Sequence, residues 1–260
     1  MAALLEGTAR DATPLERALV DLVRAAHAAP ANLTPRDLTP VRAAAGDGAL
    51  DYVLVLGSFH FINRIADLLG VDPEAVPEAL RRFEVVRRIG VRVAATLLAR
   101  MDLANRAYTP SYDAALARAA PLVQRALGRP VGDTLVAFRA RPKMVEMLAL
   151  ALEERDERST LDRTTLARVH RTVEAALPRS LADSTGFHAR PQDPVEAFAF
   201  VGTRYPARTT PTMIDALRRT GFDDLGILDL AIAVADANNW ARMHRLLDLP
   251  PELLYVGGPT

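Results

Sequence analysis

The feature that most constrains this chain is a long apolar segment, Leu50–Leu69, with a counterpart near the other end, Leu228–Leu247. When Arg64 is placed on Arg242, Asp51 falls on Asp229, and a pair of leucines closes both segments. Upstream of each segment the sequences PANLTP and PARTTP also correspond, with a Thr-Pro pair at their ends. A self-similarity of this length predicts two divergent copies of one structural unit.

Both copies are predicted to be helical. Ala, Leu and Arg dominate the chain while β-branched runs bounded by turns are scarce, which favours helix nearly throughout. We therefore expect an all-α, internally duplicated protein, with a first repeat over residues 1–127 and a second over 128–260, packed as one unit. The G-R-P segment that follows residue 127 is the expected seam.

Capping residues, prolines and hydrophobic periodicity predict the individual helices. Thr34-Pro35 and Thr210-Pro211 each supply a candidate cap and a first-turn proline, whose missing N–H costs nothing there. The segment from Arg179 to Pro194 lacks periodicity and is expected to be loop or broken helix. The two long apolar helices should be enclosed by the others, since a helix apolar on every side must be buried. Other helices are predicted at Leu15–Ala28, Ala79–Leu97, Asp113–Leu127, Pro142–Leu152, Thr164–Leu177 and Val195–Arg204.

Composition excludes several classes of function. Basic and acidic residues balance at 32 each, so no long-range field favours nucleic acid or an anionic membrane as a partner. The chain has no cysteine, which removes thiolate catalysis and thiolate metal ligands. No motif for a metal, phosphate or other cofactor is present, so we expect none. The acidic N-terminus does not resemble a signal peptide, and a cytoplasmic location is expected.

The spacing of Thr-Pro, Leu-Arg, glycine and a long apolar helix with a terminal Asn and Arg resembles the alkylhydroperoxidase D-like and carboxymuconolactone decarboxylase superfamily. The resembling residues are Thr210-Pro211, Leu217-Arg218, Gly221, Ile227-Leu228 and Asn239–Arg242, with a first copy at Thr34-Pro35, Val41-Arg42 and Phe61–Arg64. The resemblance implies an all-helical fold and a homo-oligomer.

The peroxidase branch of that family uses a C-x-x-C-x-x-x-H helix, and the corresponding region here is LADSTGFH. Leu181 and Ser184 stand where that branch has cysteines, and His188 stands at its histidine. Without thiols the peroxide chemistry has no nucleophile. The decarboxylase branch works by acid and base groups, so the resemblance leaves His188 and Ser184 as candidate catalytic residues.

A second group of candidates lies within the long helices. His60 and Arg64 are four residues apart and share a helix face, and Asn238 and Arg242 occupy the equivalent positions. The arginines could hold a carboxylate while His60 transfers a proton. Alternatively, all four groups satisfy helix ends and carbonyls of neighbouring helices. Asn63 and Trp240 are candidate substrate-binding residues beside them.

Three functions remain open at this point. The first is a cysteine-free enzyme that acts on or binds a small carboxylated organic molecule by acid and base chemistry. The second is a non-catalytic, oligomeric ligand-binding or interaction module, and the third is a peroxidase-related protein. A pocket holding two or more of His60, Arg64, His188 and Arg242 would favour the enzyme, whereas a dry, packed interior would favour the module.

Overall fold

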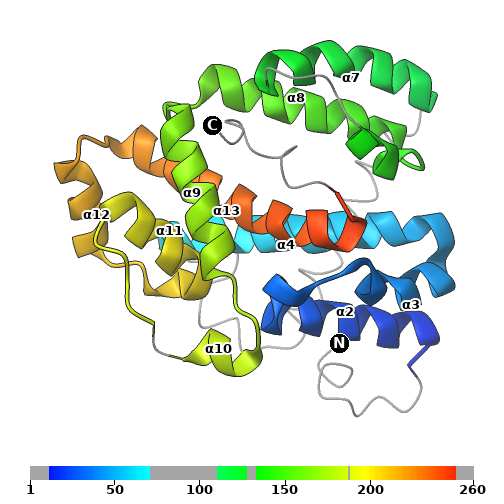
Figure 1. Ribbon diagram of the computed structural model, residues 1–260, viewed down its shortest axis with the longest axis horizontal. Helices are drawn as coiled ribbons and strands as arrows, with labels where there is room; N and C mark the ends of the chain where they lie inside the picture. The colour runs from blue at the N-terminus through cyan, green and yellow to red at the C-terminus, as the bar shows by residue number, and fades with distance from the viewer. Residues whose placement is uncertain (1–11, 71–109, 128–132, 187, 250–260) are drawn as a thin grey trace, which may run out of the picture.

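The computed structural model describes residues 12–70, 110–127, 133–186 and 188–249, and in those ranges it is all-helical (Figure 1). The all-α prediction is therefore confirmed. The α-helices are α2 (Pro14–Ala28), α3 (Pro35–Ala45), α4 (Ala49–Leu69), α7 (Tyr112–Leu127), α8 (Pro142–Arg158), α9 (Arg163–Ala176), α10 (Leu181–Thr185), α11 (Pro194–Arg204), α12 (Pro211–Arg219) and α13 (Asp224–Leu247). Short 3-10 turns are η1 (Pro30–Asn32), η2 (Gly46–Gly48), η3 (Asp133–Phe138) and η4 (Pro206–Arg208).

The two long helices, α4 and α13, pack against each other at the centre of the fold (Figure 1). Gly57 in α4 faces Asn239 and Met243 in α13, and the end of α4 shares a groove with Ile227 at the start of α13. The two helices therefore run in opposite directions. α9 crosses α13 on a different side, and α11 lies against both α9 and α13.

Two stretches of the chain share an order of elements, a helix, a 3-10 turn, a short helix and a long helix. Residues 14–70 hold α2, η1, α3 and α4, with the extra turn η2 before α4, and residues 194–248 hold α11, η4, α12 and α13. The hinge residue after the first helix has nearly the same backbone in both, with φ −144° and ψ 55° at Ala29 and φ −142° and ψ 56° at Tyr205. Each stretch also contacts the long helix of the other, because α4 packs on η4 and α13 packs on η1.

The proposed seam after residue 127 falls inside a helical hairpin. α7 and α8 lie on either side of it and pack against each other. The matching elements end near residue 70 and resume near residue 194, so the hairpin, α9 and α10 lie between them. The helix predicted over Ala79–Leu97 lies outside the described residues.

The prediction that both long helices are enclosed is correct for α13 and wrong for the outer face of α4. Val55, Phe59 and Ile62 are 53%, 64% and 63% exposed on that face. Their counterparts under the repeat alignment, Ala233, Ala237 and Trp240, are all less than 10% exposed. Among the described residues α13 packs against α4, α9 and α11, whereas α4 packs mainly against α13, with smaller contacts to η4, α3 and η2.

The described residues include one helical stretch, Pro35–Leu69, that by length and apolar composition is capable of crossing a bilayer. The same properties are found in the core helices of soluble proteins, and α4 packs along α13.

Candidate functional site

Arg64 and Arg242, predicted as substrate-binding residues, bind the ends of helices instead of facing an open cavity. Arg64 donates from Nη1 to the carbonyls of Gly202 and Thr203, the latter at 3.1 Å, in the last turn of α11. Arg242 donates from Nε to the carbonyl of Ala26 in the last turn of α2, at 3.1 Å. Carbonyls in a last helical turn lack partners within the helix and carry negative partial charge, so each arginine satisfies them.

These two contacts are reciprocal under the repeat alignment. Arg64 belongs to the first stretch of matching elements and binds α11 of the second, while Arg242 belongs to the second and binds α2 of the first. Both side chains are buried. Burial lowers the pKa of Arg64 to about 10, and burial with the charge of Arg64 lowers that of Arg242.

Asn238 completes this buried polar network. Its Nδ2 donates to Thr203 Oγ1 at 3.0 Å and to the Val234 carbonyl at 2.9 Å, and its own carbonyl accepts from Arg242 Nη1 at 2.7 Å. The Nε of Arg64 and the Oδ1 of Asn239 are buried and have no hydrogen-bond partner among the described residues. The network is otherwise satisfied by protein groups, as buried polar groups require.

His60 lies beside the two arginines but is only half-buried. Burial, then the charges of Arg242, Arg64 and His27, lower its pKa to about 3. The imidazole is therefore neutral at physiological pH and is a weak base. A general acid or base works best with a pKa near the operating pH, so this environment is poorly suited to proton transfer.

The two remaining candidates in the long helices differ in exposure. Asn63 is exposed on α4, and Trp240 is buried within the core cluster. Neither lines any of the grooves described below.

His188 joins a different cluster, about the short helix α10. Its Nε2 lies 3.0 Å from Asp183 Oδ1, and Arg204 Nη1 donates to the same oxygen at 3.1 Å. A hydrogen bond from the Arg179 backbone, then that from Arg204, lower the pKa of Asp183. Ser184 lies in α10, but its side chain is outside the described part of the structure. The cluster thus combines an imidazole, a carboxylate and a guanidinium that the sequence did not connect.

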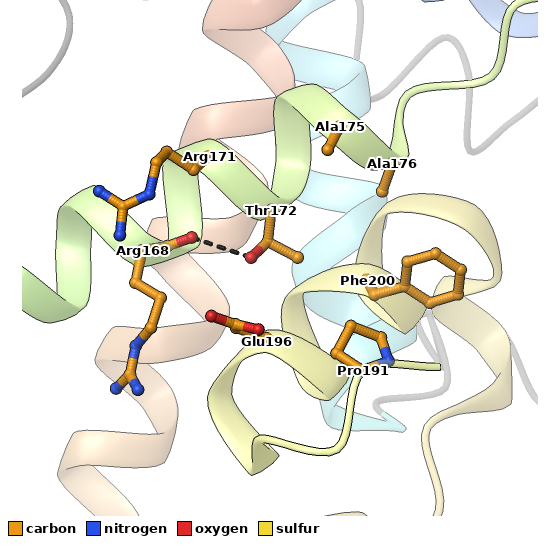
Figure 2. A pocket seen from close by; sticks show the side chains of 8 residues that line it. All are labelled: Arg168, Arg171, Thr172, Ala175, Ala176, Pro191, Glu196 and Phe200. Carbon is orange, nitrogen blue, oxygen red and sulfur yellow. Dashed lines mark hydrogen bonds between the residues drawn. The ribbon is translucent and has the colours of Figure 1, made fainter. Parts of the chain in front are cut away.

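A groove between α9 and α11 encloses a volume of about 290 Å³ (Figure 2). Arg168, Arg171 and Glu196 lie at one end, and Phe200 and Pro191 lie at the other. Sequence reasoning missed this site because its residues form no motif. The only available signal was the mixed polar and apolar face of each helix at i, i+3 and i, i+4 spacing.

Two larger grooves lie nearby. One, of about 540 Å³, runs between the end of α4 and helices α12 and α13, and is mainly apolar. The other, of about 570 Å³, lies where α9, α11 and α13 begin and is lined by their capping aspartates, Asp162, Asp193 and Asp223. Among the residues that the structure describes, no group of three or more His, Asp or Glu side chains is arranged to hold a metal.

None of these three grooves is lined by His60, Arg64, His188 or Arg242. The structure brings His60, Arg64, Asn238 and Arg242 together, and it leaves His188 in the separate cluster at α10.

Comparison with known proteins does not assign the chain to a family. No family model matches the chain, and no curated protein or solved structure is detectably similar to it.

Proposed function

We propose that the chain is a non-catalytic, self-associating helical module built from two divergent copies of one unit, of the alkylhydroperoxidase D-like type. The buried arginines and Asn238 support this over the decarboxylase-like enzyme, because their polar groups bind the protein itself. The proposal places the protein in the cytoplasm. A peroxidase-related function ranks lowest, since a thiol nucleophile is missing from the chain.

One observation carries the proposal: the exposed row of Val55, Phe59 and Ile62 on α4, named here the α4 stripe. The three residues follow helical spacing and so form one face. From Tyr52 to Asn63 the sequence holds no Asp, Glu, Lys or Arg, and His60 is neutral. A contiguous apolar, uncharged face of this kind is typical of an interaction surface.

A second copy of the chain is the occupant that these features favour. The α4 stripe can pair with itself about a two-fold axis without opposing like charges, because it is uncharged. The formal net charge of the chain is zero, so little long-range repulsion separates two copies. The equivalent residues of α13, Ala233, Ala237 and Trp240, are buried within the chain, which indicates that this face of the unit is built to be buried.

Sedimentation velocity across a range of protein concentrations tests the proposal. The wild type is expected to form a dimer or larger oligomer, and Phe59→Lys with Ile62→Lys is expected to shift it to monomer, because a buried lysine at the interface lacks a partner. Met147→Lys on α8, at a site 59% exposed, is the matched control and should leave the oligomer intact.

Two results would contradict self-association. One is a wild type that stays monomeric at all concentrations while the double variant loses thermal stability, which would show that the α4 stripe is covered within one chain. The other is a monomer that binds phosphatidylcholine vesicles through Phe59, which would assign the stripe to a membrane.

An acid and base enzyme is the second candidate, favoured by the pairing of His188 with Asp183 at 3.0 Å. A carboxylate beside an imidazole orients it for proton transfer. A thermal-shift screen of small carboxylates tests this reading, because a ligand that binds only the folded chain raises its melting temperature. Stabilisation that His188→Gln abolishes would support the enzyme, and stabilisation unaffected by it would count against this site.

A further inference from the structure

The groove between α9 and α11 has two chemically different ends (Figure 2). Phe200 and Pro191 form an apolar end, with Ala175 and Ala176 on the α9 side. The guanidinium of Arg204 lies over the Phe200 ring, 5.8 Å from its centroid. The volume of about 290 Å³ is at the small end of ligand pockets, which span roughly 300 to 1,000 Å³, so it suits a small occupant.

The polar end carries groups with unused bonding capacity. Arg168 donates from Nη1 to Asp193 Oδ2 at 3.0 Å, but its Nε is buried and has no hydrogen-bond partner in the part of the chain that the structure describes. Arg171 on the next turn forms no hydrogen bond or ion pair with the described residues, and neither does the half-buried carboxylate of Glu196. A buried donor left unbonded is costly unless a ligand or water satisfies it.

The charges at this end balance. Arg168 and Arg171 carry two positive charges, and Asp193 and Glu196 carry two negative ones. A simple anion would meet Glu196 and a simple cation would meet Arg171. A molecule with both a carboxylate and an ammonium group can instead pair with each, while its apolar part lies against Phe200 and Pro191.

We infer that this groove binds a free α-amino acid with an apolar side chain. Its carboxylate pairs with Arg171 and accepts from Arg168 Nε, its ammonium group pairs with Glu196, and its side chain lies at the Phe200 end. The inference is independent of self-association through the α4 stripe, since the groove is formed by α9 and α11 and the stripe belongs to α4.

Isothermal titration with L-phenylalanine tests the site. We expect binding by the wild type, with affinity reduced about tenfold or more in Arg171→Gln and in Glu196→Gln, since each removes one charge-assisted hydrogen bond. Arg219→Gln and Glu157→Gln remove exposed charges that do not line the groove and should bind as the wild type does. Circular dichroism of each variant confirms that it is folded.

Two analogues separate an amino acid from simpler ligands. 3-Phenylpropanoate lacks the ammonium group and 2-phenylethylamine lacks the carboxylate, so both should bind at least tenfold more weakly than L-phenylalanine. The inference is overturned if either analogue binds as well as the amino acid, if Arg171→Gln and Glu196→Gln bind like the wild type, or if L-phenylalanine at about 10 mM shows no binding to the folded protein.

Discussion

At the scale of single residues, the buried arginines of the long helices form hydrogen bonds to helices that are distant in the sequence. The guanidinium of Arg64 reaches two successive carbonyls of α11, Gly202 and Thr203, from a buried position. Both bonds come from one nitrogen, Nη1, which lies one covalent bond farther from Cα than a lysine Nζ and is held in the plane of the guanidinium. The identity of the cation should therefore matter as much as its charge.

We predict that Arg64→Lys and Arg64→Ala both lower the free energy of unfolding, by about 2 to 4 kcal/mol, because buried carbonyls lose charge-assisted hydrogen bonds. Urea unfolding monitored by circular dichroism measures the change. Arg36→Ala, at an exposed position on α3, should change it by less than about 0.5 kcal/mol. Full recovery of stability by lysine would show that charge alone suffices.

His60 provides a prediction about pH. Its pKa is near 6.5 in the unfolded chain and about 3 in the folded protein, so the unfolded state binds the extra proton. Stability is then present above pH 6.5 and declines as the pH falls toward 3, at no more than about 1.4 kcal/mol per unit. Partial exposure of the ring reduces this slope.

Unfolding free energies at pH 6.5, 5.5 and 4.5 isolate this effect from that of Glu174. That carboxylate also has a lowered pKa, of about 2, despite the opposing effect of its burial, because of hydrogen bonds from His244 and Arg245. Its ordinary value is 4.5, so it changes stability mainly below this window. We expect His60→Gln to flatten the dependence between pH 6.5 and 4.5, and an unchanged slope would contradict the lowered pKa of His60.

The sequence predicts that the buried polar residues of the long helices need hydrogen-bond partners, but it does not identify those partners. A buried arginine in an apolar helix either binds a ligand or satisfies backbone carbonyls, and both alternatives follow from the same local pattern. The deciding contact joins Arg64 to a residue 138 positions along the chain. Only the packing of α4 against α11 brings that carbonyl into reach.

At the scale of helices, close approach of α11 to the central pair depends on Gly202. A Cβ at this position would lie 2.8 Å from Val234 Cγ1 in α13 and 2.9 Å from Leu68 Cδ2 in α4. Both neighbours are fully buried branched side chains that cannot move aside without disturbing the core. The small side chain is therefore required by packing, since its backbone angles are those of an ordinary helix.

We predict that Gly202→Ala destabilises the protein by about 1 to 3 kcal/mol through overpacking, which outweighs the gain of up to about 1 kcal/mol in helix propensity. Thermal unfolding provides the measurement. Gly48→Ala is the matched control, because its added Cβ would meet only Ala45, at 3.9 Å, and should leave stability unchanged or slightly raised. Equal stability of the two variants would contradict the packing argument.

Helix positions were well predicted where capping signals were local. Asp37 accepts hydrogen bonds from the backbone and hydroxyl of Thr34, in line with the predicted Thr-Pro start. The charged run after Leu152 continues α8 to Arg158, because Arg and Glu are good helix formers. The exposed face of α4 could not be predicted, because hydrophobic periodicity does not reveal which apolar faces find a neighbour.

At the scale of the whole molecule, the two matching stretches are interlocked rather than set side by side. Each long helix packs on the 3-10 turn of the other stretch, and each buried arginine binds the first helix of the other. The correspondence of Pro30–Pro35 with Pro206–Pro211 predicts two similar stretches, but it does not predict how they cross. The groove between α9 and α11 could not be predicted either, since α9 belongs to neither stretch and its position beside α11 is set only by the packing of the fold.

This crossing predicts which segments lose protection from hydrogen exchange when one of the two arginines is replaced. Loss of Arg242 removes the partner of the Ala26 carbonyl, which lies in α2, so amides of the last turn of α2 and of η1 should exchange with solvent faster in Arg242→Ala. Loss of Arg64 should instead loosen the last turn of α11 and η4. Each variant is thus expected to weaken the stretch that does not carry it.

Hydrogen exchange measured by mass spectrometry under native conditions resolves these segments, with Arg36→Ala as the reference for an exposed arginine. Because the contacts cross, the two variants should give complementary maps: α2 with η1 for Arg242→Ala and α11 with η4 for Arg64→Ala. Faster exchange confined to α13 or α4, the helices that carry the substitutions, would mean that the stretches open independently. The interlocked arrangement would then contribute little to the stability of the molecule.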